Sequence, residues 1–382
     1  MNRYNVTAVL FIIIIAVVSI GSVSANAEYI TDLSKEETIN EVVSYVFGES
    51  NAFSKLFITI WSFVNSGNQN DISLIEDAEY VNLIKDENGF LYFPAYKVSV
   101  DEYANKTIDL SNMVDNFIYI QAPNKMIDGY TNKLVYNYNF SNENADEFLE
   151  KLNDAGVQTY DLRKDLLECG EEEDLFFKTD HHWKTNTAFW AYQKVVSTLN
   201  DRFNLDIDSD NYYRNLDNYN IKTYENCYLG SLGRRTGQAI SGLDDYTYIE
   251  PKYSTNYTLY NMMSSDIEPI KNGSFANAIA VKQLLYDNNV ETNKYATYFE
   301  WDYGYLRVIN NALEDGKKVL LIKDSYALPF AAFLSTSVYE IDMIDLRDQP
   351  KADLERVIAN NDYDVVIMLY NTESFTNQMF NF

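Results

Sequence analysis

Residues 318–333 read KVLLIKDSYALPFAAF, in which an apolar run, a polar turn and a second apolar run follow one another directly. The first run, Val319–Ile322, is short and has no polar position, as expected for a strand that is covered on both faces of a parallel sheet. The second run predicts a helix from about Ala327, because Pro329 is well tolerated in a first helical turn. Ser325 is therefore expected between the carboxyl end of a buried strand and the start of a helix.

The alternation of strands and helices extends on both sides of this stretch. Short apolar runs predict strands, and apolar positions at helical spacing predict helices. The strands are expected at 81–84, 89–93, 116–120, 157–162, 338–344 and 364–368, and the helices at about 143–155, 187–199 (with Asn186 as N-cap) and 353–359. This order predicts βαβ units and hence an α/β fold, with a parallel sheet flanked by helices.

The chain of 382 residues divides by composition into three parts. Residues 1–27 combine a single Arg, an uncharged apolar stretch and the small-residue motif Ala25-Asn26-Ala27, which is typical of a secretory signal peptide; a retained membrane anchor is the alternative. Residues 28–80 are acidic and predict a helical N-terminal extension. The main domain is expected at 81–382, with a Tyr- and Asn-rich insertion at about 201–300 that is predicted to be β or irregular. The chain is thus expected to be exported to the cell surface or beyond.

The charge balance and the cysteine count exclude several classes of protein. The 30 Lys and Arg residues against 57 Asp and Glu residues give a formal charge of −27. This balance argues against a nucleic-acid-binding protein, because phosphate contacts need clustered basic residues. Two cysteines are too few for a disulfide scaffold or a four-cysteine zinc site. Cys169 and Cys227 are compatible with one disulfide or with two free thiols.

The only two histidines of the chain are adjacent, at His181 and His182. In extended backbone, residues two apart project to the same side, so the carboxylate of Asp180 is expected to lie beside His182. There it can fix the imidazole tautomer and stabilise the imidazolium. His181 is then expected to point the other way, as a packing or hydrogen-bonding residue. The alternative is that both histidines belong to a solvated turn before a helix.

Ser325 is a candidate partner for this histidine. At a helix N-terminus, free N–H groups and the positive end of the helix dipole can stabilise an oxyanion. Asp324 is expected to orient the turn and Ser325 to be the nucleophile. The alternative is that Ser325 is an ordinary helix N-cap.

Two motifs resemble a known family. Thr179-Asp180-His181-His182-Trp183 resembles the DHHW motif, and the segment 323–326 resembles the nucleophile block of the same family. The DHHW family belongs to the SGNH-hydrolase-like superfamily, and the alginate O-acetyltransferase proteins are its best-known relatives. In this family the Asp-x-His pair precedes the Ser, as it does here. The resemblance covers roughly residues 80–375 and implies Asp180 as the orienting acid, His182 as the base and Ser325 as the nucleophile.

The chain departs from ordinary SGNH enzymes at Lys323, where a Gly usually precedes the Asp-Ser pair. The sequence therefore does not identify the donors that would complete an oxyanion hole. The candidates for oxyanion or substrate contacts are Asn371, Gly230, Ser231, Gly233 and Arg234, each of which could instead be an ordinary turn residue. Arg234 could also attract a charged glycan, and the cluster 212–214 (Tyr-Tyr-Arg) could bind sugar through its aromatic faces.

The resemblance implies an exported serine-dependent O-acetyltransferase or acetylesterase that acts on a cell-surface or extracellular polysaccharide and needs no cofactor. It also implies a membrane-bound acyltransferase as a partner that supplies acetyl groups. A non-catalytic glycan-binding or cell-wall assembly protein with the same fold is the main alternative. A metal site built from Asp180, His181, His182 and a distant carboxylate is a further alternative, although adjacent histidines rarely bind one ion.

Overall fold

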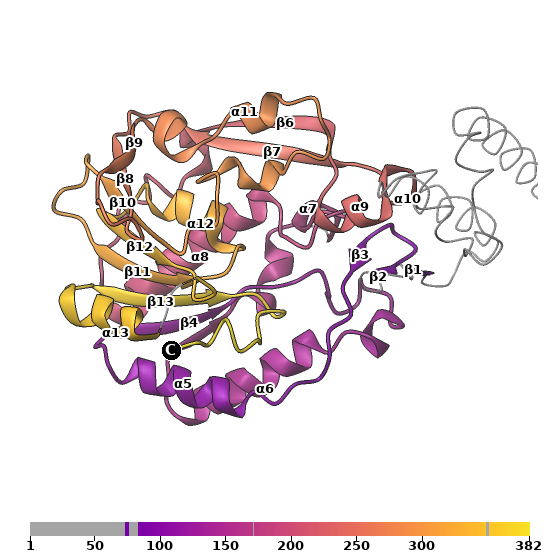
Figure 1. Cartoon of the computed structure of the whole chain (residues 1–382), viewed down its shortest axis with the longest axis horizontal. Coiled ribbons are helices and arrows are strands. Elements are labelled where there is room, and N and C mark those ends of the chain that lie inside the picture. The colour runs from indigo at the N-terminus through magenta and orange to yellow at the C-terminus, as the bar shows by residue number, and fades with distance from the viewer. Residues whose placement is uncertain (1–72, 76–82, 171, 349–350) are drawn as a thin grey trace, which may run out of the picture. The chain divides into compact units, whose positions relative to one another are not determined.

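A computed structural model describes residues 73–75, 83–170, 172–348 and 351–382, all within the compact unit Ile72–Phe382. Its centre is a sheet with the strand order β5-β4-β13-β11-β12-β10-β8-β9 (Figure 1). The strands are β4 (Phe117–Gln121), β5 (Thr159–Asp161), β8 (Tyr257–Asn261), β9 (Pro269–Gly273), β10 (Tyr305–Asn310), β11 (Lys318–Lys323), β12 (Glu340–Ile344) and β13 (Val365–Tyr370). The predicted α/β fold with a helix-covered sheet is confirmed.

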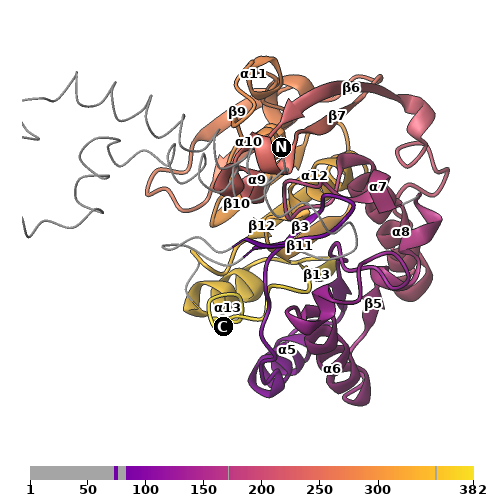
Figure 2. The same cartoon turned by 90° about the vertical axis from the view of Figure 1, so that its right-hand side faces the viewer.

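The two faces of the sheet are covered by different helices (Figures 1 and 2). Helices α5 (Asp101–Ser111), α6 (Ser141–Asp154) and α13 (Lys351–Asn360) cover one face, while α8 (Thr185–Phe203) and α12 (Ala327–Leu334) cover the other. Alternate residues of a strand point to opposite faces. In β11, accordingly, Leu320 and Ile322 pack with the first set of helices, and Val319 and Leu321 pack with the second. Burial on both faces explains why this strand has no polar interior position.

The sheet is mixed rather than purely parallel. Strands β5, β4, β13, β11 and β12 are parallel to their neighbours, as predicted. Beyond β12, however, β10, β8 and β9 run antiparallel. Strands β8 and β9 lie within residues 201–300, so this segment extends the main sheet. The predicted parallel sheet thus corresponds to the five strands from β5 to β12, and the antiparallel strands β10, β8 and β9 extend it at one edge.

The remaining elements surround the sheet. Strands β1 (Ser73–Ile75), β2 (Leu83–Lys85) and β3 (Leu91–Tyr92) form a small antiparallel sheet, and β6 (Tyr219–Tyr228) and β7 (Asp244–Pro251) form a two-stranded ribbon. The short helices are α7 (Glu172–Leu175), α9 (Ser231–Thr236), α10 (Gln238–Ser241) and α11 (Gln283–Tyr286), with a π-helical turn at Phe275–Ile279 and 3₁₀ turns at Val135–Asn137, Leu162–Lys164, Leu166–Glu168, Leu216–Asn218 and Lys294–Thr297.

Most of the expected elements are present, with two differences. Helix α8 begins at Thr185, and Lys184 is its N-cap, so Asn186 lies inside the first turn and is not the cap that the sequence predicted. Helix α5 was missed because its buried positions are Ala104, Thr107 and Leu110 among charged and polar residues. Such a weak apolar stripe gives little periodic signal.

Several expectations concern residues that the structure does not describe. The expected signal peptide at 1–27 lies outside the described residues, as does the extension at 28–80 apart from β1. Among the described helices, none combines the length and apolar character needed to cross a bilayer. Cys169 and Cys227 are both free thiols.

Candidate active site

Ser325 lies in the turn between β11 and α12, as the sequence predicted. The turn is fixed by the buried carboxylate of Asp324, which accepts the N–H of Tyr326 at 2.9 Å. Its second oxygen accepts the backbone N–H of Asn371 at 2.7 Å and the hydroxyl of Ser374 at 2.7 Å. Burial raises the pKa of Asp324, and these hydrogen bonds oppose the rise. Asp324 therefore shapes the turn, while the side chain of Ser325 remains partly accessible.

His182 bridges Ser325 and Asp180. Its Nε2 lies 2.8 Å from Ser325 Oγ, and its Nδ1 lies 2.6 Å from Asp180 Oδ1. Because a carboxylate accepts hydrogen bonds, Nδ1 carries the proton and Nε2 is the acceptor for the Ser325 hydroxyl. The Tyr295 ring stacks on the His182 imidazole at 3.7 Å between centroids. The structure thus brings Asp180 and His182, which are two positions apart, together with Ser325, which follows His182 by 143 positions.

The Asp180–His182 pair is formed by a bend and not by an extended strand. Asp180 Oδ1 accepts the backbone N–H of His182 at 3.1 Å as well as its Nδ1–H. This local loop closes between Phe176 and Trp183, which form an isolated antiparallel bridge. The indole N–H of Trp183 then donates to Tyr326 O at 3.0 Å, so the histidine segment is tied directly to the serine turn.

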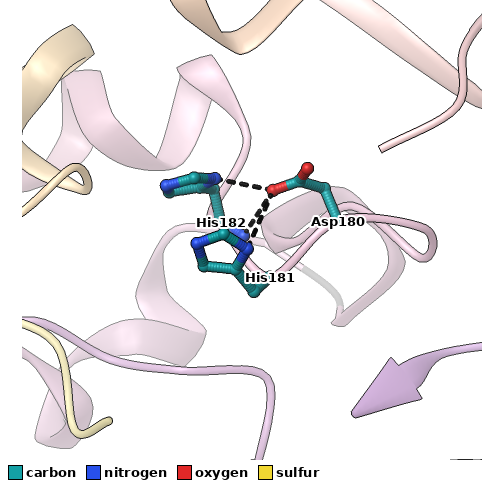
Figure 3. Close-up of side chains that lie close together, drawn as sticks. All are labelled: Asp180, His181 and His182. Atoms are coloured by element: carbon teal, nitrogen blue, oxygen red, sulfur yellow. Dashed lines mark hydrogen bonds and ion pairs between the residues drawn. The ribbon is translucent and has the colours of Figure 1, made fainter. Parts of the chain in front are cut away.

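His181 lies beside His182 rather than on the opposite side, which corrects the prediction from strand alternation. The two imidazole centroids are 3.8 Å apart, and the Nδ1 atoms of both rings face the same oxygen, Oδ1, of Asp180 (Figure 3). His181 Nδ1 lies 2.9 Å from Ser231 Oγ. Its largely enclosed position, with His182 next to it, lowers the pKa of His181 to about 3. The His181 ring is therefore neutral at physiological pH.

Asp180 is almost completely buried and is held by contacts from the segment 228–231. Its Oδ2 accepts the hydroxyl of Tyr228 at 2.8 Å and the N–H of Ser231 at 2.6 Å. Burial alone would raise the pKa of Asp180, but the adjacent His182 imidazole and the hydrogen bonds from His182 and Ser231 hold it well below its usual range. The carboxylate is thus ionised, as an orienting acid requires.

The expected substrate contacts at 230–234 have a different role in this structure. The N–H of Gly230 donates to Thr179 Oγ1 at 2.7 Å, and that of Gly233 donates to Thr179 O at 2.8 Å. A Cβ on Gly230 would lie 2.3 Å from Asp180 Cβ, and one on Gly233 would lie 2.8 Å from Thr179 Cβ. Arg234 donates to Leu229 O at 3.1 Å. These backbone amides hold the Asp180 loop and are not available to an oxyanion.

Asn371 is likewise engaged by the protein. Its Nδ2 donates to Asp324 Oδ2 at 2.9 Å, in addition to the backbone contact above. Its Oδ1 accepts the N–H of Glu373 at 2.6 Å. Asn371 follows β13 and supports the turn of the neighbouring strand β11, so it positions Ser325 through Asp324.

The cluster 212–214 lies away from Ser325. The Tyr212 ring packs against those of Tyr213 and Tyr253, and the Tyr253 hydroxyl contacts Tyr219, which in turn lies 3.2 Å from Thr336 Oγ1. Thr336 follows the carboxyl end of α12, whereas Ser325 precedes its amino end. An eight-residue helix is about 12 Å long. The cluster is therefore at the opposite end of α12 from the candidate site.

Three further residues support the site without having been singled out as candidates. Lys125 is buried, and its Nζ donates to Asp180 O at 2.8 Å, Phe177 O at 3.3 Å and Lys178 O at 3.4 Å. Burial lowers the pKa of Lys125 to about 8. Asp244 accepts the N–H groups of Lys178 and Thr179, each at 2.8 Å. Lys125 follows β4, whose carboxyl end lies at the same sheet edge as Ser325. This position directly after a strand is the sequence feature that could have identified Lys125 as a site residue. Asp244 and the stacking residue Tyr295 gave no such signal.

The chelating groups of Asp180, His181 and His182 lie within 4.8 Å of one another, which is compatible with a metal site. However, both nitrogens of His182 already bond to Asp180 and Ser325. Both oxygens of Asp180 also accept protein hydrogen bonds. An ion bound there would have to break this network. The donor set therefore suits proton transfer better than metal coordination.

Known proteins resemble this chain in sequence motif and in fold. The family described as "SGNH hydrolase-like domain, acetyltransferase AlgX" matches residues 123–217, which include Asp180 and His182. The structure of Bacillus cereus PatB1 with a sulfonyl adduct has a TM-score of 0.65 and 21% identity, and covers 82% of this chain and 99% of its own. A DHHW family protein from Eubacterium siraeum has a TM-score of 0.61 and 18% identity, and covers 81% and 97%. No curated protein matches the sequence.

These likenesses, at about one residue in five identical, concern the fold. They agree with the motif match at 123–217, which rests on the sequence. The resemblance inferred from the two motifs is thus confirmed, and this chain has an SGNH-hydrolase-like fold that is similar to that of a DHHW family protein.

Proposed function

We propose that this protein is an exported serine-dependent O-acetyltransferase or acetylesterase that acts on a polysaccharide through an acyl-enzyme. One observation carries the proposal: His182 hydrogen-bonds to Ser325 through one imidazole nitrogen and to the buried carboxylate of Asp180 through the other. A serine hydroxyl is a weak nucleophile until a base removes its proton, and a base needs a fixed orientation to do so. The three side chains have the contacts that this chemistry requires.

In the first half of the reaction, Ser325 Oγ attacks the carbonyl carbon of an acetyl ester while its proton passes to His182 Nε2. The tetrahedral intermediate collapses when the ester C–O bond breaks, and His182 returns the proton to the leaving oxygen. Asp180 stabilises the imidazolium that exists between the two transfers. The products are an acetyl-Ser325 ester and a free alcohol.

In the second half, an acceptor hydroxyl gives its proton to His182 Nε2 and its oxygen attacks the acetyl carbonyl. Breaking the bond to Ser325 Oγ regenerates the enzyme, and His182 returns the proton to the serine. With a sugar hydroxyl as acceptor the enzyme is a transferase, and with water it is an esterase. The two outcomes differ in how well the site holds the acceptor and excludes water.

The intermediate needs a donor for its oxyanion. Within the part of the chain that the structure describes, the N–H of Ser325 donates to no protein acceptor. It lies at the amino end of α12, where the helix dipole favours negative charge. We assign the first oxyanion contact to this amide, in place of the amides at 230–233 and the side chain of Asn371.

The polysaccharide acceptor and the cellular location belong to the proposal. The AlgX acetyltransferase family match supports acyl transfer, and the leader-like residues 1–27 support export. An exported enzyme has no cytoplasmic acyl donor within reach. We therefore include a membrane-bound acyltransferase as the partner that supplies acetyl groups.

Covalent labelling tests the proposed nucleophile. Phenylmethanesulfonyl fluoride should add one sulfonyl group to Ser325, located by mass spectrometry of the peptide, and should abolish turnover of 4-nitrophenyl acetate. Ser325→Ala should take up no label, whereas Ser374→Ala should still be labelled because its hydroxyl serves only Asp324. Ester turnover by Ser325→Ala, or a label elsewhere, would reject the mechanism. Glycan binding by a wild-type protein without ester turnover would favour the non-catalytic alternative.

A further inference from the structure

The loop 299–304 lies at the sheet edge that carries Ser325. It leads into β10, whose first residue, Tyr305, pairs with Ile344 at the carboxyl end of β12. Ile344 in turn lies level with Ile322 in β11, three residues before Ser325. The loop before β10 and the turn after β11 therefore lie at the same end of the sheet, on strands that are separated by β12 (Figure 1).

Charged contacts attach this loop to the nucleophile strand. Lys323, whose side chain is almost inaccessible, forms an ion pair with Asp302 and lies 3.3 Å from Asp345. Arg347 donates to Asp302 at 2.5 Å. Lys323 is two residues before Ser325, a backbone span of at most about 7 Å. The residue that replaces the usual glycine of this motif thus anchors the loop beside the site.

The other end of the same segment contacts the catalytic base. Tyr295, four residues before Phe299, stacks on His182 and donates its hydroxyl to Tyr326 O at 3.0 Å. The segment from 295 to 302 is therefore attached to the site at both ends. Its position relative to Ser325 and His182 is fixed by these contacts.

The backbone between the two anchors is strained. Phe299 and Glu300 have φ angles of 67° and 69°, in the left-handed region that is unfavourable for residues with a Cβ. The turn is held by the N–H of Phe299 donating to Ile279 O at 2.8 Å and by an ion pair of 2.7 Å between Glu300 and Lys271. Strain of this kind persists where the surroundings impose it, and it concentrates at ligand-binding positions.

This strained turn presents Trp301 to solvent. Trp301 is 69% exposed, whereas Trp183 and Trp190, the other tryptophans of the described residues, are buried. An indole that is this exposed buries little of its surface against the protein. It offers instead a flat apolar face beside the charged groups of Asp302 and Arg347.

A sugar ring is complementary to an apolar face with charged groups beside it, because the sugar has C–H groups on its face and hydroxyls around its rim. Large aromatic side chains with a polar edge are suited to such amphipathic ligands. Glu300 and Asp302, the sequence neighbours of Trp301, are paired with Lys271, Lys323 and Arg347, so they leave no uncompensated local charge, whereas the whole chain carries a formal charge of −27. This field disfavours a polyanion. The ligand that fits is an uncharged oligosaccharide.

We propose that Trp301 is a stacking platform for an uncharged oligosaccharide acceptor whose reactive hydroxyl reaches Ser325. This inference rests on the proposed function and adds the class of acceptor. Trp301 is the sequence neighbour of Asp302, and the Lys323 side chain joins Asp302 to the strand that precedes Ser325. The platform acts on acceptors of several units.

The test is the dependence of transfer on acceptor length. Cello-oligosaccharides of one to six units serve as acceptors, with 4-nitrophenyl acetate as donor. For Trp301→Ala, the ratio of kcat/KM for the hexamer to that for the monomer should fall about tenfold, as expected for the loss of one aromatic contact. Tyr212→Ala removes an exposed aromatic ring at the opposite end of α12 and should leave this ratio unchanged. An equal effect on all lengths would overturn the inference, as would a preference for oligouronates.

A binding measurement separates this inference from the proposed chemistry. In Ser325→Ala, cellohexaose should protect an exposed tryptophan from quenching by acrylamide, and adding Trp301→Ala should remove the protected signal. Absence of protection by cellohexaose would overturn the platform even if Ser325 proves catalytic. Protection together with full ester turnover by Ser325→Ala would reject the mechanism and keep the binding site.

Discussion

The two halves of the candidate site are built in different ways. Ser325 stands between a strand and a helix, and its turn is shaped by the neighbouring residue Asp324. Asp180 and His182 stand in a segment of bends that has little regular structure of its own. Their positions depend on contacts with residues that are about 50 to 65 positions away. The comparison teaches that the serine is placed mainly by secondary structure and the histidine mainly by tertiary contacts.

This difference has an energetic reason. A strand–turn–helix unit satisfies most of its backbone groups within the sheet and the helix, whereas an irregular loop must find more of its partners elsewhere. Around Asp180 those partners are the ammonium of Lys125, the carboxylate of Asp244 and the amides at 230–233. Substitutions at these remote positions should therefore damage the acid–base pair more than equivalent changes damage the serine turn.

The largest effect should come from the pair itself. His182→Ala should lower kcat/KM for 4-nitrophenyl acetate by about 10⁶-fold, and Asp180→Asn should lower it by about 10⁴-fold, because the amide favours the wrong imidazole tautomer. His181→Ala is the matched control, since its ring contacts neither Ser325 nor the reacting proton. Equal losses from the two histidine variants would contradict the assignment of His182 as base.

The next effect tests the support of the histidine loop. Gly230→Ala should lower activity by about 100-fold, because the new Cβ would lie 2.3 Å from Asp180 Cβ and must displace the loop. It should also lower the free energy of unfolding by about 1–3 kcal/mol. In Gly170→Ala the added Cβ meets Asp174 Cβ at 3.7 Å, an ordinary contact, so both quantities should be nearly unchanged. Full activity in Gly230→Ala would show that the loop is not held as tightly as the structure implies.

A pH profile tests the role of the Lys125 ammonium. Activity should fall as pH rises through about 8, because the neutral amine has one N–H fewer for the three carbonyls of the histidine loop. Lys125→Met should lower activity by about tenfold and should remove this alkaline limb. If the alkaline limb persists in Lys125→Met, another titrating group causes it. The charged groups that face Lys125 are the carboxylates of Asp180, Asp244, Glu373 and Asp86.

Stability should change in the opposite direction over the same pH range. The pKa of Lys125 is about 8 when folded and near 10.5 when unfolded, so between these values the unfolded chain binds more protons. The free energy of unfolding should therefore rise with pH from about 8 to 10.5 relative to Lys125→Met, by up to about 3 kcal/mol. Denaturant titrations at several pH values measure this. A parallel fall of stability and activity would mean that the alkaline loss is unfolding.

The smallest effect should come from the serine turn. Asn371→Ala removes one donor to Asp324 and leaves the backbone N–H of residue 371 and the hydroxyl of Ser374 in place. The free energy of unfolding should fall by about 1–2 kcal/mol, and activity should fall only a few-fold. Asn377→Ala, at an exposed residue that accepts a hydrogen bond from Tyr103, is the control. If Asn371→Ala loses as much activity as Gly230→Ala, the serine turn depends on tertiary contacts as strongly as the histidine loop does.

Much of the central architecture could be predicted from the sequence, and the reasons are local. The apolar run at 319–322 and the turn to α12 were placed correctly, as were β4, β12, β13 and helix α6, because their apolar periodicity is strong. Helix α5 was missed because its buried stripe is built from Ala104, Thr107 and Leu110. The antiparallel strands β10, β8 and β9 were not foreseen, because strand direction depends on the partner and not on the strand's own residues.

In the candidate site, too, the residues could be identified from the sequence, whereas their long-range contacts could not. The sequence singled out Asp180, His182 and Ser325, and the structure brings them into contact. The placement of His181 was wrong because alternation applies to strands and the segment is bent. The candidates at 230–234 and Asn371 have their donors engaged by Thr179, Asp180, Leu229 and Asp324. Spacing along the chain carries no information about which amide a distant side chain will take.

The sequence by itself determined which groups are available for chemistry: two adjacent histidines, an aspartate beside them, and a serine at the end of a buried strand. Only the tertiary structure decided how those groups are oriented and what supports them. Lys125, Asp244 and Tyr295 support the site through contacts across the fold, and Asp302 attaches the loop that carries Trp301 to Lys323. The physical reason is that secondary structure follows from neighbours in the chain, whereas an irregular loop takes its conformation from partners that only folding brings near.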